Sequence, residues 1–190
     1  MKMHKLKVTG GNNVVNRIIY DFKFVMLNCF VNRIPCWHLR KSFYLLCGMS
    51  IGKKTRIGIN TIIFEPQKVC IGDRTIINDN CYIDARGGLN IGNDVSISAK
   101  SCIYTTSHDV DSSFFEYKEY ACKVENNVWL GSNSLIIGPS LIKSNTVIGA
   151  GSVFKGVSEK NGIYIGNPAK LIKIRKIKQN YEVDFKAYFR

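Results

Sequence analysis

The sequence contains no apolar run long enough to cross a bilayer. A spanning helix needs roughly 18 or more consecutive apolar residues, and polar residues interrupt the most hydrophobic stretch, near the N-terminus, at Asp21, Lys23, Asn28, Asn32 and Arg33. The start of the chain also lacks the continuous apolar core and small-residue cleavage site of a secretory signal. We therefore expect a protein that is not transmembrane and that stays in the cytoplasm.

Metal-ligand spacing is absent as well. The seven cysteines, at positions 29, 36, 47, 70, 81, 102 and 122, form no CxxC pair and have no histidine at zinc-ligand spacing. We predict no metal site. In a reducing compartment these residues should be buried structural thiols.

Acidic residues are few: 14 of them oppose 27 lysines and arginines, which gives a formal net charge of +13. Such a charge attracts nucleic acid, a membrane surface or an anionic substrate. No nucleic-acid-binding motif accompanies it, and the cations are spread along the chain, so we expect no nucleic-acid partner. With 190 residues and 45% hydrophobic content, the sequence predicts one folded unit with terminal arms.

A six-residue period runs through the centre of the chain. From Ile51 the sequence reads IGKKTR, IGINTI, IFEPQK, then after two residues IGDRTI, INDNCY, IDARGG, and after two more IGNDVS, ISAKSC, IYTTSH. The pattern stops over 109–123 and resumes as VENNVW, LGSNSL, IIGPSL, IKSNTV, IGAGSV. An aliphatic residue leads each hexad, the second position is often glycine, and the fifth is usually small or short-branched.

This period fits short strands joined by turns, with the lead residue stacked inward along a solenoid. Three hexads would make one triangular coil. The insertions Val69–Cys70 and Leu89–Asn90 each follow 18 residues of hexads, which we interpret as a longer corner in each coil. A sandwich or barrel of short strands is the alternative, but it predicts turn signals every 8 to 12 residues and no fixed lead residue. We favour the solenoid.

Over residues 51–175 the sequence resembles the hexapeptide-repeat acyltransferases. The block VENNVWLGSNSLIIGPSLIKSNTVIGAGSV with IGNPAKLIKIRK is similar to the closing coils and C-terminal cap of galactoside and maltose O-acetyltransferases, and CGMSIGKKTRIG is similar to the opening of bacterial polysaccharide O-acetyltransferases. The resemblance implies an all-β solenoid, a left-handed parallel β-helix. It also implies acetyl-CoA as co-substrate and a homotrimer with active sites between neighbouring subunits.

We divide the chain into three parts. Residues 1–48 form an N-terminal helical arm, residues 49–166 the β-helix with an extruded loop at 109–123, and residues 167–190 a C-terminal cap and tail with a short helix. Aromatic residues and cations alternate over 13–48, a pattern that favours one or two amphipathic helices. These helices could cap the first coil, or one could be an interfacial helix that gives peripheral membrane association.

His108 is the candidate catalytic residue. A hydroxyl needs a base when it attacks a thioester carbonyl, and histidine suits that task near neutral pH. His108 ends a coil immediately before the interruption of the repeat, and the resemblance implies that it is the general base; the alternative is a surface corner residue. Its orienting partner, a backbone carbonyl or a carboxylate such as Glu116 or Glu119, stays open. His4 and His38 lie outside the repeat and match no catalytic position.

The resemblance also implies acceptor-binding residues. Asn78 lies 30 residues before His108, the separation of the acceptor-contacting asparagine and histidine of galactoside-type enzymes, although an asparagine ladder explains it equally. Arg86 stands where related enzymes have a carboxylate, which favours an anionic glycan. Trp129 resembles a tryptophan beside the substrate and acetyl-CoA channel; the alternative is a core aromatic.

For the coenzyme, the resemblance implies binding along Gly131, Ser132, Gly149 and Ala150, with Lys170 and Lys173 near the phosphates. Small residues at a coil corner and a solvated basic tail are the structural alternatives. The sequence thus predicts an acetyl-CoA-dependent O-acetyltransferase acting on a sugar hydroxyl of a bacterial surface polysaccharide by direct attack. A small-molecule (antibiotic or free sugar) O-acetyltransferase and a catalytically silent glycan-binding scaffold are the alternatives.

Overall fold

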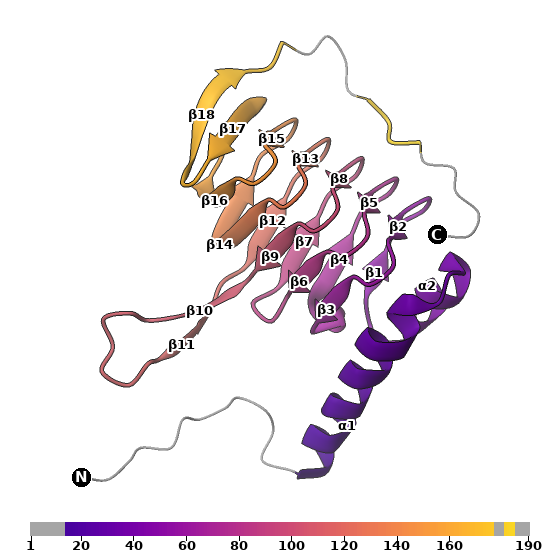
Figure 1. Ribbon diagram of the computed structural model, residues 1–190. Coiled ribbons are helices and arrows are strands. Elements are labelled where there is room, and N and C mark those ends of the chain that lie inside the picture. The colour runs from indigo at the N-terminus through magenta and orange to yellow at the C-terminus, as the bar shows by residue number, and fades with distance from the viewer. Residues whose placement is uncertain (1–13, 177–180, 185–190) are drawn as a thin grey trace.

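The computed structural model describes residues 14–176 and 181–184 (Figure 1). Short parallel strands stack into a solenoid of about six turns, with helices at its N-terminal end. The predicted all-β solenoid with an N-terminal helical cap is therefore confirmed. In the described part of the chain, no helix is both long enough and apolar enough to span a membrane.

Each turn of the solenoid contributes one strand to each of three faces. The first face comprises β1 (Ser50–Ile51), β4 (Val69–Ile71), β7 (Leu89–Ile91), β12 (Cys122–Val124) and the second part of β14 (Leu135–Ile142). The second face comprises β2 (Arg56–Ile57), β5 (Ile76–Ile77), β8 (Ser96–Ile97), β13 (Trp129–Leu130), β15 (Val147–Ile148) and β17 (Gly162–Gly166). The third face comprises β3 (Ile62–Phe64), β6 (Tyr82–Asp84), β9 (Cys102–Tyr104), the first part of β14 and β16 (Val153–Val157).

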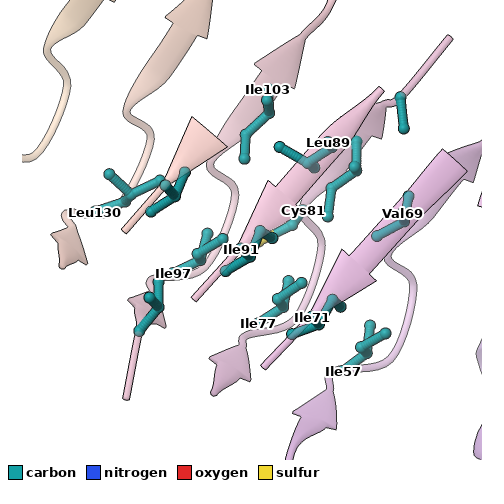
Figure 2. Packing of buried hydrophobic residues seen from close by; sticks show 14 of the residues in the cluster. Ile57, Val69, Ile71, Ile77, Cys81, Leu89, Ile91, Ile97, Ile103 and Leu130 are labelled. Atoms are coloured by element: carbon teal, nitrogen blue, oxygen red, sulfur yellow. The ribbon is translucent and has the colours of Figure 1, made fainter. Parts of the chain in front are cut away.

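The lead residues of the hexads form the core. Ile57, Ile77, Ile97 and Leu130 stand in one register across four coils, and none is more than 1% exposed (Figure 2). Because side chains alternate between the two sides of a strand, this inward column leaves the neighbouring residues of each strand facing outward. The same alternation places the aliphatic side chains inside the solenoid and the polar and reactive side chains on its outer surface.

The fifth position of the hexad is small because its side chain bonds the backbone inside a corner. Thr55 and Thr75 are buried, and the Thr55 hydroxyl accepts the Thr75 N–H while donating to the Gly72 carbonyl. A buried backbone group without such a partner is costly. A larger residue would have no room at these corners, which explains the short side chains that the repeat requires.

The two-residue insertions lengthen a strand, so our interpretation of a longer corner was wrong. Val69 and Leu89 begin β4 and β7, pair with each other, and are buried in the core. Cys122 continues the same column on β12, so the chain is back in the coil before the expected interruption ends at 123. The physical reason is that the first inserted residue is apolar or a thiol and gains by pointing inward.

The cysteine prediction was also wrong in part. All seven cysteines are unpaired, but only Cys81 and Cys122 are buried, whereas Cys29 and Cys70 are exposed. Cys70 lies between Val69 and Ile71 on β4, and because those two residues point inward, the alternation of the strand turns Cys70 outward.

Helical elements cover the end of the stack at the first coil. They are α1 (Val14–Val25), a π-helical segment (Met26–Phe30), a short 3₁₀ segment (Val31–Arg33) and α2 (Trp37–Leu46). The Asn28 carboxamide donates to the Ile63 carbonyl at 3.0 Å and accepts the Ile63 N–H at 2.8 Å. The fully buried Arg40 donates to the Ile57 carbonyl at 2.8 Å. These side chains make the hydrogen bonds that the backbone of a preceding coil would otherwise make.

Two antiparallel pairs leave the solenoid pattern. β10 (Thr106–His108) and β11 (Tyr117–Glu119) form a hairpin that projects from the stack, and β17 pairs with β18 (Ala169–Ile174) at the far end (Figure 1). A 3₁₀ turn (Pro66–Lys68) precedes β4. Residues 181–184 have no regular structure, and the rest of the tail in which we expected a helix lies outside the described residues, as does His4.

Replacing Asn28 with alanine should destabilise the protein. The change leaves the Ile63 N–H and carbonyl buried without partners, at a cost of about 1–3 kcal/mol for each orphaned group. Chemical denaturation measures the effect. Asn28→Asp is the matched variant: its carboxylate still accepts from the Ile63 N–H but cannot donate to the carbonyl, and a buried charge then faces that carbonyl oxygen, so its loss should be at least as large as that of Asn28→Ala. Equal stability of all three proteins would contradict the role of Asn28.

Candidate active site

His108 ends β10 at the loop end of the hairpin's two-stranded part, where it pairs with Tyr117, and its ring is held on two sides. The Phe115 ring stacks on it with a centroid distance of 3.7 Å and an interplanar angle of 11°. Tyr117 contacts it edge-on, with centroids 5.8 Å apart. Nδ1 lies 3.0 Å from the Phe115 carbonyl oxygen. Because a carbonyl can only accept, Nδ1 is the nitrogen that carries the proton in the neutral imidazole, and in that tautomer Nε2 has the free lone pair.

The orienting partner of His108 is therefore a backbone carbonyl, one of the possibilities that the sequence left open. Phe115 has a positive φ of 51°, which few bulky residues adopt. This turn brings the carbonyl back toward β10. The Glu116 and Glu119 carboxylates are not needed for this role, since the carbonyl already holds Nδ1.

Arg86 lies next to this hairpin and is bound to a buried carboxylate. Its Nε and Nη2 donate to the two oxygens of Asp84 at 2.9 and 2.7 Å, and Asp84 also accepts from the Thr106 hydroxyl at 2.7 Å. The guanidinium carbon lies 5.7 Å from the Tyr117 ring centroid and 5.5 Å from that of Phe64. Arg86 thus links the third face to the residues that hold His108.

Asp84 is fully buried and yet charged. Burial alone raises the pKa of its carboxyl group, but the hydrogen bonds from Arg86 and Thr106 outweigh burial, so the pKa lies below its ordinary value. The same ion pair raises the pKa of Arg86. Much of the charge of Arg86 is consequently balanced by Asp84, which weakens our sequence-based expectation that Arg86 attracts an anionic acceptor.

Trp129 and Asn78 lie on a different part of the solenoid, on the second face and its corner with the third. The Trp129 side chain is 48% exposed, so the alternative of a core aromatic is wrong. Its indole N–H donates to the Ser98 hydroxyl at 3.0 Å. Asn78 is half-buried, donates to the Ile97 carbonyl of the next coil at 2.9 Å and lines a cavity of about 150 Å³. Its neighbours in the stack are Gly58 and Ser98, so it belongs to no asparagine ladder. Asn78 therefore has a structural task whether or not it also binds a ligand.

The four small residues predicted to bind coenzyme form a stripe along this same corner. A Cβ on Gly131 would lie 2.5 Å from the Ala150 nitrogen, and one on Gly149 would lie 2.9 Å from the Ile165 side chain. Both glycines are therefore required by the stacking of the coils. Ser132 and Ala150 are exposed on the outside of the corner. The stripe is a narrow ridge without bulky side chains, which a long ligand can approach closely.

Lys170 and Lys173 lie on β18 at the end of this stripe. Lys170 pairs with Ile165 on β17, the strand that follows Gly149 in the stack, and Lys173 pairs with Ile163. Both lysines are exposed. The structure therefore brings together the small-residue stripe and the two cations, as an elongated phosphate-bearing ligand requires.

The candidate residues form two groups on different edges of one chain. His108 and Arg86 lie at the corner between the third and first faces, whereas Trp129, Asn78 and the small-residue stripe lie on the second face and its corner with the third. Sequence reasoning missed Asp84, Phe115 and Tyr117. The spacing of Asp84 and Arg86 could have suggested an ion pair, but nothing in the sequence indicated the hairpin fold that brings Phe115 to His108.

Within residues 14–176 and 181–184, no cluster of three or more histidine, cysteine or acidic side chains could hold a metal ion. An imidazole held through Nδ1, an exposed stripe of small residues and two lysines are features of this parallel β-helix that suit a group transfer. A long phosphorylated donor suits such a surface.

Comparisons with known proteins identify the family. Residues 121–156 match the family described as bacterial transferase hexapeptide (six repeats). WcaF of Escherichia coli, an acetyltransferase assigned to colanic acid biosynthesis, is 33% identical over 131 residues, which cover 68% of this chain and 71% of WcaF. WbbJ of the same organism, an O-acetyl transferase assigned to lipopolysaccharide biosynthesis, is 26% identical over 82% of each chain.

A solved structure shows the same fold. A hexapeptide-repeat acetyltransferase of Vibrio cholerae, solved with acetyl-coenzyme A, superposes with a TM-score of 0.80 and 22% identity over 88% of this chain and 93% of its own. The chain belongs to the hexapeptide-repeat acetyltransferases. The resemblance drawn from the sequence is therefore confirmed, including its link to polysaccharide acetyltransferases.

Arg86→Met should destabilise the protein by about 2–4 kcal/mol near pH 7. This loss is smaller than that expected on breaking a fully buried ion pair, because the Arg86 side chain is partly exposed. The change leaves the Asp84 charge buried without its guanidinium partner. The Asp84 pKa is lowered in the folded wild type, so the pair stabilises above the ordinary carboxyl pKa of about 4, and this contribution is lost in acid. Thermal melts should show a smaller difference from wild type near pH 3.5.

Lys118→Met is the matched control, because Lys118 forms an ion pair with Asp109 on the exposed part of the same hairpin, with a 2.7 Å contact. An exposed pair contributes little to stability, so this variant should melt close to wild type at neutral pH. A neutral-pH loss in Arg86→Met no larger than that of the control would contradict the buried-pair account.

Proposed function

We propose that this protein is an acetyl-CoA-dependent O-acetyltransferase that acts on a sugar hydroxyl of a bacterial surface polysaccharide, with His108 as general base. The observation that carries the proposal is the His108 ring itself. It is clamped by Phe115 and Tyr117, and its Nδ1 proton is committed to a carbonyl. An imidazole held this way presents Nε2 as an acceptor, which a glycan-binding scaffold would not need.

The reaction is a direct transfer. Nε2 of His108 takes the proton of the acceptor hydroxyl as its oxygen attacks the thioester carbonyl carbon of acetyl-CoA. When the tetrahedral intermediate collapses, the carbon–sulfur bond breaks and the imidazolium returns the proton to the leaving thiolate. Holding both reactants on one surface replaces a bimolecular encounter by orientation, so no covalent enzyme intermediate is needed.

The donor would bind along the small-residue stripe. Its pantetheine arm would follow the exposed corner at Ser132 and Ala150, and Lys170 and Lys173 would lie near the phosphates, where two exposed ammonium groups attract negative charge. Trp129 would border the channel, since its ring is exposed and its indole N–H is tied to Ser98. Acetyl-coenzyme A is present in the structure of the Vibrio cholerae relative.

The acceptor class rests on the relatives and on the hairpin. The assignments of WcaF and WbbJ to colanic acid and lipopolysaccharide biosynthesis favour a surface glycan. Asn78 and Arg86 remain candidates for acceptor contacts. Because Asp84 already balances the charge of Arg86, Arg86 does not need an anionic acceptor as its partner. A neutral sugar ring could therefore stack beside Tyr117. A small-molecule acceptor within the same reaction class is the alternative.

We further propose a homotrimer in which each active site lies between two subunits. The third face carries outward-facing apolar residues, Ile62, Phe64, Tyr82, Cys102, Tyr104, Leu135, Ile137 and Val153, whereas the first face turns out Ser50, Cys70, Asn90 and Lys123. The third face separates the two groups of site residues. If a neighbouring subunit packed on this face, the His108 of one subunit would lie opposite the small-residue stripe of the other.

The hairpin tip supports this arrangement. Val110 is 92% exposed and Phe114 is 66% exposed at the end of the projecting loop, and apolar residues at such a tip gain by packing on a neighbouring chain. We place the reaction in the cytoplasm, a reducing compartment in which exposed thiols such as Cys29 and Cys70 stay free.

His108→Ala should lower the rate of acetyl transfer by about 100- to 10,000-fold, because the alcohol loses its base. Coenzyme A affinity should stay within about twofold, since the stripe is untouched. Release of free thiol from acetyl-CoA, measured with a panel of neutral and acidic glycans, gives the rate. His38→Ala, at an exposed position of α2, is the control and should keep full activity. Equal acceptor-dependent rates in His108→Ala and wild type would remove His108 as the base.

Mixing two inactive variants tests the shared site. Ala150→Trp should block the stripe, and His108→Ala should remove the base, so each trimer alone is inactive. After both proteins are unfolded and refolded together in equal amounts, about one quarter of the sites would pair an intact base with an intact stripe. Activity near one quarter of wild type is expected. If each site is built from a single chain, no activity returns.

A further inference from the structure

The helical cap exposes a large apolar surface on the side away from the solenoid. Seven residues of α1 and its continuation, Val14, Val15, Ile18, Ile19, Phe22, Val25 and Met26, are all exposed, with Ile18 at 61% and Phe22 at 64%. At 100° per residue they cover about 140° of the helix without a polar residue between them. Surfaces of this kind on soluble proteins mark contact sites. We call this the outer cap face.

The opposite side of α1 already does the capping. The Phe24 ring lies 4.5 Å from that of Phe64, and Leu27 and Asn28 are buried against the first coil. A helix that only closed the solenoid would be polar on its other side. The outer cap face is therefore not explained by the fold.

The second helix of the cap also exposes apolar residues. Leu39, Phe43 and Leu46 of α2 are exposed, Leu46 at 82%, while Trp37, Arg40 and Tyr44 on its other side are buried. Both helices lie across the end of the stack next to β1–β3 (Figure 1). A neighbour packed on the third face would lie beside the solenoid, whereas the outer cap face lies at the N-terminal end of the solenoid.

The charges around the outer cap face have one predominant sign. Apart from the buried Arg40, residues 14–54 contain six cations, Arg17, Lys23, Arg33, Lys41, Lys53 and Lys54, and a single acidic residue, Asp21. On the helical wheel of α1, Lys23 borders the apolar stripe on one side, and Asp21 followed by Arg17 borders it on the other. Cations with long stems at such positions can reach headgroups while the apolar residues insert.

We propose that the outer cap face docks onto a bilayer containing anionic lipid. α1, with 12 residues, is about 18 Å long; it would lie in the plane of the interface with its apolar side about 5–10 Å deep. The solenoid axis would then point away from the membrane. This proposal goes beyond the proposed acetyl transfer, since it concerns the lipid surface at which the enzyme works.

A trimer would strengthen this docking. Three parallel solenoids present their N-terminal ends on one side of the assembly, so three cap faces could engage one membrane together. Binding of the second and third faces is then intramolecular, which raises overall avidity. An enzyme held there would meet glycans carried on lipid.

Vesicle sedimentation with the full-length protein tests the proposal. Wild type should bind vesicles of phosphatidylglycerol and phosphatidylethanolamine, more weakly at high salt, and should bind phosphatidylcholine vesicles at least about tenfold less tightly. The double variant Ile18→Gln with Phe22→Gln should lose at least about tenfold in binding to the anionic vesicles. Arg17→Gln with Lys23→Gln should lose the preference for anionic lipid.

The matched control is Val157→Gln with Ile172→Gln, which removes two exposed apolar residues from the far end of the solenoid and should bind as wild type does. Coenzyme A binding, expected unchanged in each variant, reports that the fold and the stripe are intact. Failure of wild type to bind anionic vesicles, or equal loss in the control, would overturn the proposal. If wild type does not bind vesicles and Ile18→Gln with Phe22→Gln instead lowers the oligomeric state in solution, the surface is an interface between copies of the chain.

Discussion

Register between successive coils is the constraint on which the rest of this structure depends. Each coil repeats the backbone of the one before it at strand spacing, about 4.8 Å away, so every position is repeated along a column. The inward columns must be aliphatic, as in the series Ile57, Ile77 and Ile97, and corners that approach closely must be glycine, as at Gly131 and Gly149. Chemistry can be built only from outward positions, corners and insertions.

The candidate site follows from this rule. His108, the proposed base, lies on an insertion, where the chain leaves the coil after β9 and folds back as a hairpin, because no inward column could hold an imidazole between two aromatic rings. The Phe115 carbonyl selects its tautomer. The donor stripe lies at a corner, where stacked small residues leave a continuous ridge. The single chain keeps His108 and the small-residue stripe on two edges, and in the homotrimer that we propose, association through the apolar third face would bring them together.

The two ends of the solenoid solve the problem of unpaired backbone groups differently. At the C-terminal end, β18 folds back antiparallel on β17. At the N-terminal end, Asn28 and Arg40 bond the carbonyls and amides of the first coil. Because α1 caps with one side only, the two interpretations of the arm that the sequence left open, a cap and an interfacial helix, are compatible in one helix.

The sequence by itself determined the solenoid, since a lead aliphatic residue every six positions admits few other folds. It also made His108, Trp129 and the stripe candidates for the site, through their place in the repeat and a family resemblance. Only the tertiary structure decided what depends on contacts between distant residues. The inward turn of Val69, the pairing of Arg86 with buried Asp84, and the carbonyl that orients His108 all belong to this group. Periodicity reports which way a side chain points along a strand, but a hairpin outside the repeat obeys no period, and its contacts are set by packing.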